Sequence, residues 1–383
     1  MEVISNVWHI ISAFLVFLLG VFFTLMVSKY FKVKKYRSLF LYCWHSLFCI
    51  GYMFYSINNV ADSTLYYING EFGPSSFSLG TRAVEYLVYV FRLMDFSYLG
   101  VFLVFNIFGS IGLLAFYASL NQVVISSSLF LRRVALLVVL LPSVSFWSSA
   151  IGKDSLSFLA IGLALWAALA LERRTLLMIV SIFIMLFVRP HMAGMLVIAI
   201  GVAIFVHRKV SITQRMLVGI LAIGAAVIMV PFALKYAGLE QVSSASDIHT
   251  YIDKRQGYNQ SGGASIDIAS MSLPMQLFTY LLRPLPFEAR SITALAASLD
   301  NLVLLAIIVY YFFSKVRSSR VKSRHSLIGN RIFMWSYVVM SWFILASTTA
   351  NLGISVRQKW MFAPILIFLL ISYISSRKTE KSM

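Results

Sequence analysis

The sequence predicts an all-α polytopic membrane protein, and three observations support this prediction. Of the 383 residues, 60% are hydrophobic and only 12% are charged, whereas soluble domains carry about 25% charged residues. Apolar stretches recur along the chain, each close to the ~20 residues that a helix needs to cross a bilayer. The formal net charge is +18, yet no basic block lies in a polar domain that could hold nucleic acid. We therefore expect membrane lipids, and no nucleic acid, as partners.

About 11 stretches are apolar and long enough to be transmembrane helices. The first lacks a basic leader and an Ala-x-Ala-like site, so we expect a retained span instead of a cleaved signal peptide. Both cysteines, Cys43 and Cys49, lie inside an apolar stretch, which leaves no disulfide framework and no Cys-based zinc site. In chain order the predicted spans are 7–28, 38–56, 97–118, 134–150, 155–171, 175–188, 192–206, 216–234, 299–314, 332–347 and 360–374.

The segment 176–206 is the least regular, because it is too long for one ordinary span and too short for two. A single helix here would reverse the orientation of all later spans. The cations of 315–331 would then lie outside, against the rule that Lys and Arg are enriched in cytoplasmic loops. We therefore expect two short helices, with Arg189 and His191 at their turn, slightly inside the bilayer boundary where unpaired charge is costly. Lys153 and Asp154 cap the preceding hairpin in the same way.

The positions of Lys and Arg set the predicted orientation, because cytoplasmic loops retain positive charge during insertion. The eleven spans place 21 of the 32 basic residues on one side, with only two acids, Glu172 and Glu380. The other side receives 12 of the 14 acids. We therefore expect the N-terminus outside, the C-terminus in the cytoplasm, and a single integral membrane domain over 1–383.

Two longer segments are assigned to the outer face. The first loop, 57–96, begins with polar residues around Asp62 and Tyr66, and apolar residues then recur at helical spacing in 82–95. This pattern is typical of an interfacial helix. The large loop, 235–298, starts polar and becomes apolar from Leu273. It predicts a mobile loop that leads into a second helix lying on the membrane.

Familiar catalytic motifs are missing from the sequence. The segment 152–155 superficially resembles a phosphate-binding loop, but Trp147 stands where that motif needs a glycine, and the segment faces away from ATP. Neither His-Glu-x-x-His nor Asp-x-Asp occurs. Asp247, His249 and Asp253 could in principle ligate a metal, but scattered loop residues of this kind are usually solvated. We expect no metal and no other cofactor.

Cations gather at the predicted outer boundary, where the positive-inside bias should deplete them. Any one of them could simply extend toward lipid phosphates. Five are arginines, whose planar fork binds phosphate oxygens bidentately, so the set indicates a lipid-linked phosphate or pyrophosphate as ligand. The seven residues are Arg82, Lys153, Arg189, Arg283, Arg290, Arg357 and Lys359.

Purely structural interpretations stay open beside this functional one. We interpret four histidines, His9, His45, His207 and His325, as packing or surface residues. The structural alternatives for the other groups are a kinked helix end for Arg189 and His191, an ion pair for Lys153 and Asp154, and an anchored interfacial helix for Arg283, Glu288 and Arg290.

Four short motifs are spread between Asp62 and Lys359. They are Phe146-Trp147-Ser148 before Gly152-Lys153-Asp154, then Arg189-Pro190-His191, then Leu282-Arg283-Pro284-Leu285-Pro286-Phe287-Glu288-Ala289, and Asn351-Leu352-Gly353 before Arg357. Their succession resembles multispanning proteins encoded with bacterial surface-polysaccharide genes, the O-antigen and exopolysaccharide polymerases of the Wzy and EpsG type.

The resemblance implies a glycosyltransferase of the bacterial inner membrane, acting in lipopolysaccharide or exopolysaccharide biosynthesis. Such an enzyme joins oligosaccharide repeat units carried on undecaprenyl pyrophosphate at the periplasmic face, with a chain-length regulator protein as a further partner. In similar proteins an outer-face arginine is essential, and Arg189 is the position that looks most like it.

This chemistry requires neither metal nor nucleotide, because pyrophosphate is already a good leaving group. Guanidinium groups can stabilise the charge that develops as the bond breaks, and His191 or Asp154 could accept the proton of the acceptor hydroxyl. We therefore predict Arg189, His191 and Asp154 as catalytic residues, with Arg283 and Arg357 beside Arg189 on the pyrophosphate. The predicted substrate-binding residues are Lys153, Arg283, Glu288, Arg290, Arg357, Lys359, Arg82 and Tyr66, the last by stacking on a sugar.

Three other functions remain open. A flippase or transporter of lipid-linked oligosaccharides would need charges deep within its spans and internal symmetry, and the sequence shows neither. A membrane acyltransferase would need an inward-facing histidine and acid, which are also missing. A non-enzymatic component of a polysaccharide assembly complex would be indifferent to Arg189→Ala.

Overall fold

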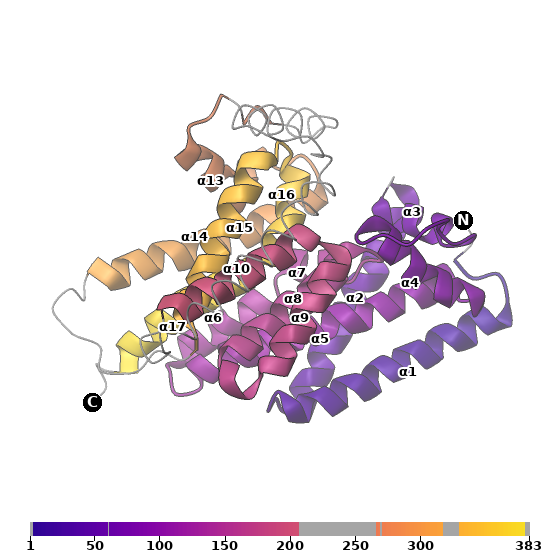
Figure 1. Ribbon diagram of the computed structural model, residues 1–383, viewed down its shortest axis with the longest axis horizontal. Helices are drawn as coiled ribbons and strands as arrows, with labels where there is room; N and C mark the ends of the chain where they lie inside the picture. Colours follow the sequence, from indigo (N-terminus) through magenta and orange to yellow (C-terminus); the bar gives the residue numbers. More distant parts are fainter. Residues whose placement is uncertain (1–2, 60, 207–265, 269, 317–328, 380–383) are drawn as a thin grey trace. The chain divides into compact units, whose positions relative to one another are not determined.

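The computed structural model describes residues 3–59, 61–206, 266–268, 270–316 and 329–379, and within these ranges its regular elements are helices without a strand (Figure 1). Close contacts between Cα atoms divide the chain into two units. Unit 1 comprises Met1–Gln122 and Val134–Pro190, and unit 2 comprises Val123–Arg133 and His191–Met383.

Long apolar helices and one tight hairpin form the first half of the chain, which supplies unit 1. Helices α5 and α8 approach closely at two glycines, since a Cβ atom on Gly162 would lie 2.5 Å from the carbonyl oxygen of Gly112. Small residues permit such contacts between apolar helices. The elements are α1 (Val7–Tyr30), α2 (Lys35–Asn58), α3 (Asp62–Asn69), α4 (Thr81–Leu93), α5 (Tyr98–Val124), α6 (Leu129–Val139), α7 (Pro142–Ser148), α8 (Lys153–Ala168), η1 (Leu171–Arg173) and α9 (Thr175–Val188).

Contacts within unit 1 show that the turns between its helices lie at two ends of the unit. At one end the rings of Phe31 and Trp166 lie 5.5 Å apart, and the Arg174 guanidinium is 3.9 Å from the Trp166 ring. At the other end the Tyr98 hydroxyl, where α5 begins, lies 2.9 Å from Ser56 Oγ, where α2 finishes. We call the first the basic end, because its turns carry Lys29, Lys32, Lys34, Lys35, Arg37, Arg173 and Arg174. The charge distribution predicts this same grouping.

The helices of unit 2 surround α13 and α17. Helix α13 packs against α14, α15 and α16, and α17 packs against α14 and α15. The chain bends by 63° between α16 with η3 and α17, and the Tyr337 hydroxyl of α15 donates to Met361 O at this bend, 3.0 Å away. The elements are α10 (Pro190–Val206), α13 (Leu273–Leu282), η2 (Pro286–Glu288), α14 (Ile292–Val316), α15 (Arg331–Thr348), α16 (Leu352–Gln358), η3 (Lys359–Met361) and α17 (Ala363–Thr379).

Local sequence explains where several helices begin. Asn6, Asn330 and Asn351 precede α1, α15 and α16, and each side-chain oxygen accepts a backbone N–H of the first turn at 2.8 to 3.0 Å. Asparagine is among the strongest N-cap residues for this reason. Pro142 and Pro190 open α7 and α10, a position where the missing N–H of proline has no intrahelical partner to lose.

The described residues form a multi-pass, all-helical protein, but the expected count of eleven spans is wrong for them. Six helices are long and apolar enough to cross a membrane, or seven if the bent pair of α16 with η3 and α17 is one span. The predicted spans 155–171, 175–188 and 192–206 form α8, α9 and α10, with 16, 14 and 17 residues. At 1.5 Å per residue these helices reach roughly 21 to 26 Å, short of the ~30 Å apolar core. The stretch 216–234 lies outside the described residues.

The helices expected in the two loops are present, but they pack against protein. In α4, Val84 and Val88 are completely buried, and they share one core with Tyr66 and Tyr67 of α3. Helices α3 and α9 cover this stripe, so it contacts protein, and the interfacial position of the helix stays a prediction. Helix α13 begins at Leu273 as expected, and its last turn is buried within unit 2.

Candidate functional site

Arg189 follows directly on α9, at the opposite end of the α8–α9 hairpin from η1. A residue before proline is disfavoured in the helical conformation, and the backbone of Arg189 is non-helical, with φ −145° and ψ 77°. Pro190 therefore ends α9 at Val188. The Arg189 side chain is only 7% exposed, so the charge predicted at the bilayer boundary is buried inside unit 1.

Two side chains of α8 hold the Arg189 guanidinium. Nη2 lies 2.5 Å from Asp154 Oδ1, and Nε donates to Ser157 Oγ at 3.2 Å. Asp154 and Ser157 are three residues apart and therefore share one face of α8. Asp154 also lies in the first turn of α8, where the helix dipole favours a carboxylate.

These two contacts do not use all the N–H donors of the Arg189 guanidinium. Arginine has five N–H donors, and the contacts to Asp154 and Ser157 use two of them. Among the residues that the structure describes, no side chain accepts from Nη1 of Arg189. Ionisable residues inside membrane proteins are costly and frequently functional. The remaining N–H groups could bind the oxygens of a phosphate.

The turn before α8 adds Tyr66 to this region. Gly152 has φ +151°, a conformation that residues with a side chain rarely adopt. A Cβ atom there would lie 3.2 Å from Cε2 of Tyr66. The Tyr66 residue is 6% exposed, so its ring packs against this turn instead of presenting a face to a sugar. The half-buried Lys153 follows directly on Gly152.

The start of α4 reaches the same end of the hairpin. The N–H of Gly80 donates to Phe187 O at 2.8 Å, two residues before Arg189. Arg82, in the first turn of α4, is exposed and donates to Ser76 in its own loop. Arg82 is therefore a surface cation close to this region, whereas Arg189 is an internal one.

In unit 2 the predicted residues Arg283 and Glu288 contact each other. Arg283 Nε and Nη2 lie 2.9 and 2.5 Å from Glu288 Oε1, and the Leu285 N–H donates to Oε2 at 2.7 Å. Burial disfavours the charged carboxylate, but hydrogen bonds from Arg283 and Leu285 outweigh burial and lower the pKa of Glu288 below its usual value. This pair fixes the turn between α13 and α14.

Lys359 belongs to the same region of unit 2, although it is completely buried. Its ammonium donates to Asn301 Oδ1, and Asn301 Nδ2 donates to Pro284 O at 3.0 Å. Asp300 is also completely buried, and its charge acts on Lys359. Asn301 thus connects Lys359 to the turn that carries Arg283.

The other predicted site residues differ in their exposure. Arg290 is exposed just before α14, Arg357 is half-buried in α16, and His191 is half-buried in the first turn of α10. Arg189 belongs to unit 1, whereas Arg283 and Arg357 belong to unit 2. The gathering of these three arginines around one pyrophosphate therefore stays a prediction.

Sequence reasoning missed three residues of these clusters. Ser157 could have been found from its spacing of three after Asp154, which predicts a shared helix face. Asp300 and Asn301 could also have been found from the sequence, because they are adjacent polar residues at the start of an apolar stretch. Polar groups in such a stretch need hydrogen-bond partners when they are buried. Asn301 holds Lys359, and Ser157 holds Arg189.

His45, which we interpreted as a packing or surface residue, is buried and belongs to a polar network. Its Nδ1 lies 2.6 Å from Asn106 Oδ1, and its Nε2 lies 2.9 Å from Ser148 Oγ. The three residues come from α2, α5 and α7 and are buried. Its partners lie 61 and 103 residues away in sequence, so no local pattern could have predicted this network.

A metal site is not found in the described part of the chain, where no three His, Cys, Asp or Glu side chains form a group that could hold an ion. Asp247, His249 and Asp253 lie outside the described residues. Comparison with known protein families, with curated proteins and with solved structures gives no match.

Proposed function

We propose that this chain is a polymerase of the bacterial inner membrane that joins oligosaccharide repeat units carried on undecaprenyl pyrophosphate at the periplasmic face. The observation that supports it is the buried contact between Arg189 and Asp154, two residues from separate motifs of the Wzy and EpsG type. Desolvating two charges costs several kcal/mol per ion. A reactive centre is a stronger reason for such a pair than packing, which apolar residues would serve better.

Arg189 binds the pyrophosphate in this proposal. Its contacts with Asp154 and Ser157 fix the plane of the guanidinium, and its remaining donors suit two phosphate oxygens in bidentate geometry. A cation positioned in advance stabilises the negative charge that develops on the leaving oxygen. Transition-state stabilisation by Arg189 is the main catalytic effect that we propose.

The reaction is a single displacement at the anomeric carbon. A hydroxyl oxygen of the acceptor sugar forms the new bond to C1, and the bond from C1 to the pyrophosphate oxygen breaks, so undecaprenyl pyrophosphate leaves with the electron pair. The hydroxyl proton passes to Asp154 or to His191, and general-base help of this kind contributes about 10²- to 10⁴-fold. A single displacement inverts the anomeric configuration.

The residues of unit 2 divide into two roles in the proposal. Arg283, Arg290 and Arg357 bind the anionic headgroup or the glycan. Lys359 is completely buried, so it acts as a positioning residue through Asn301 and the turn beyond it. Glu288 holds the guanidinium of Arg283. A chain-length regulator protein remains a proposed partner.

The deciding experiment supplies the full chain, reconstituted in liposomes, with an undecaprenyl-pyrophosphate-linked repeat unit and follows product length on a gel. We expect longer products from the unaltered chain and a loss of about 10²-fold or more for Arg189→Gln. Arg189→Lys retains the charge but loses the planar fork, so it should also be impaired.

Arg173→Gln is the matched control, because Arg173 is an exposed arginine of unit 1 at the basic end. It should polymerise like the unaltered chain, and the unfolding temperature of every variant shows whether the variant is folded. Substrate that crosses the bilayer without growing would identify a transporter instead. Full polymerisation by folded Arg189→Gln would remove Arg189 from the mechanism.

A further inference from the structure

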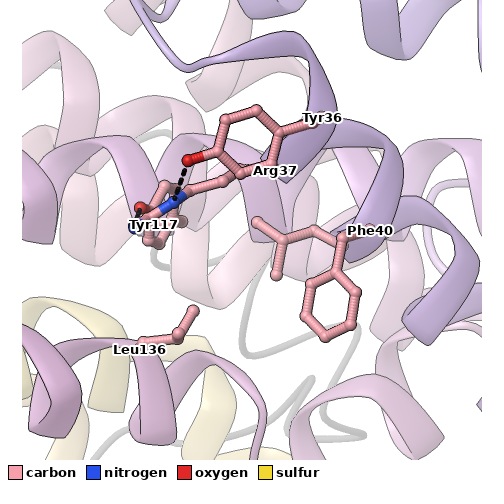
Figure 2. Close-up of a pocket in the computed structure, with 6 residues that line it drawn as sticks. Tyr36, Arg37, Phe40, Tyr117 and Leu136 are labelled. Atoms are coloured by element: carbon pink, nitrogen blue, oxygen red, sulfur yellow. Dashed lines mark hydrogen bonds between the residues drawn. The ribbon is translucent and has the colours of Figure 1, made fainter.

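A groove lies at the basic end of unit 1, away from the Arg189 region. It has a volume of about 330 Å³ and is lined by residues of α2, α5 and α6 (Figure 2). Helix α2 begins at this end with Lys35 and ends at Asn58, and its 24 residues give it a length of about 36 Å. The groove is therefore independent of the proposed reaction. Its lining residues are Tyr36, Arg37, Phe40, Leu41, Tyr117 and Leu136.

Arg37 is the cation among the residues that line the groove. Arg37 Nη1 donates to the Tyr117 hydroxyl, and Nε lies 3.4 Å from the Tyr36 hydroxyl. Figure 2 shows both contacts as dashed lines at one side of the groove. Within the described residues no carboxylate pairs with Arg37. Its Nη2 is left for an anionic ligand, and the two tyrosines limit how the guanidinium can turn.

The rest of the groove is apolar. Phe40 is 50% exposed, Leu41 is buried, and Leu136 of α6 is half-buried. Figure 2 shows the side chains of Phe40 and Leu136 away from the two hydroxyl groups. A ligand that satisfies both parts needs a negative headgroup and a hydrocarbon chain.

The charge around the groove has one sign. Five cations fall between residues 29 and 37, and no acid occurs between Glu2 and Asp62. Basic segments next to a membrane helix attract anionic lipid by about 1 kcal/mol per Lys or Arg. This charge complementarity selects an anionic lipid over a neutral one.

We propose that this groove binds one anionic phospholipid, with its phosphate on Arg37 and the Tyr36 and Tyr117 hydroxyls and one acyl chain along Phe40 and Leu136. The ligand is a structural lipid of the surrounding membrane, so the proposal does not depend on the polymerase activity. The binding site is distinct from non-specific attraction to the basic segment, because it requires both the fork of Arg37 and the apolar wall.

Native mass spectrometry of the purified full chain tests the proposal. The chain in detergent is titrated with phosphatidylglycerol, with phosphatidylcholine of the same acyl chains, or with glycerol 3-phosphate, which has no chain. We expect one retained phosphatidylglycerol and at least about tenfold weaker retention of the other two ligands. Arg37→Gln should weaken retention of phosphatidylglycerol about tenfold or more, as expected for loss of a charge-assisted hydrogen bond.

Two variants separate the site from general charge attraction. Lys34→Gln removes one exposed cation three residues away without touching the groove, and it should retain the lipid like the unaltered chain. Leu136→Trp fills the apolar wall without changing the charge, and it should weaken retention as Arg37→Gln does. Equal loss in Lys34→Gln and Arg37→Gln would overturn the proposal, and so would normal retention by Leu136→Trp. Unfolding temperatures show that each variant is folded.

Discussion

The guanidinium Nη2 of Arg189 lies 2.5 Å from the carboxylate Oδ1 of Asp154, although 35 residues separate them in the chain. The pair joins the first turn of α8 to the residue that follows α9. It therefore connects the two helices at the end of the hairpin where α8 begins and α9 ends. We expect both the stability of the fold and the proposed chemistry to depend on this contact.

Asp154→Asn should destabilise the fold by about 3 to 5 kcal/mol, because it leaves the buried Arg189 charge without its partner. Chemical denaturation of the protein in detergent micelles measures this loss. The double variant Asp154→Asn/Arg189→Gln should lose less than the sum of its single variants, since it removes both charges. Additive losses would show that the two side chains do not interact.

Gly152→Ala should destabilise unit 1 by about 1 to 3 kcal/mol, because φ is +151° at this position and the new methyl group meets Tyr66. Gly51→Ala is the matched control, since a Cβ atom there meets nothing within 4 Å. That control should be neutral or slightly stabilising, as expected for alanine inside a helix. Unfolding temperatures in micelles compare the two, and equal effects would argue against strain at Gly152.

Glu288→Gln should reduce the sensitivity of the protein to acid. Burial of the Glu288 carboxyl opposes ionisation, but hydrogen bonds from Arg283 and Leu285 lower its pKa in the folded protein. The resulting stabilisation is present above the unfolded pKa, about 4.3, and is lost as the pH falls through the folded pKa. Unfolding temperatures between about pH 3 and pH 7 should fall more steeply for the unaltered chain than for Glu288→Gln.

Glu172→Gln provides the control for this pH series, because Glu172 is exposed in η1. It should follow the curve of the unaltered chain. If the unfolding temperature of Glu288→Gln falls as steeply with decreasing pH as that of the control, the contact with Arg283 contributes nothing to stability in acid.

Asn301→Leu should cost about 2 to 5 kcal/mol, because it leaves the buried Lys359 ammonium without an acceptor and also removes the bond to Pro284 O. The double variant Asn301→Leu/Lys359→Met should lose less than the sum of its two single variants, since both single variants remove the contact between Asn301 and Lys359. Denaturation of these variants in micelles checks the prediction. Additive losses would mean that the contact between Asn301 and Lys359 is unimportant.

Most of the helices could be predicted from the sequence, because the length of an apolar stretch and the polar or proline residues that end it are local properties. The predicted segment 175–188 has the same bounds as α9, and Pro190 separates it from α10. The number of spans was overestimated, since short apolar helices such as α9 satisfy a composition test without the length needed to cross a bilayer. The burial of α4 was also missed, because an apolar stripe does not indicate whether lipid or protein covers it.

Amino-acid sequence by itself determined the class of this protein, the approximate helix bounds and the cations worth following, because composition, spacing and charge are written along the chain. Only the tertiary structure decided which polar groups meet. Arg189 contacts Asp154 and Ser157, and Lys359 is held by Asn301, since a buried charge selects its partners through space once the helices have packed. For the same reason the groove beside Arg37 emerged only when three helices came together.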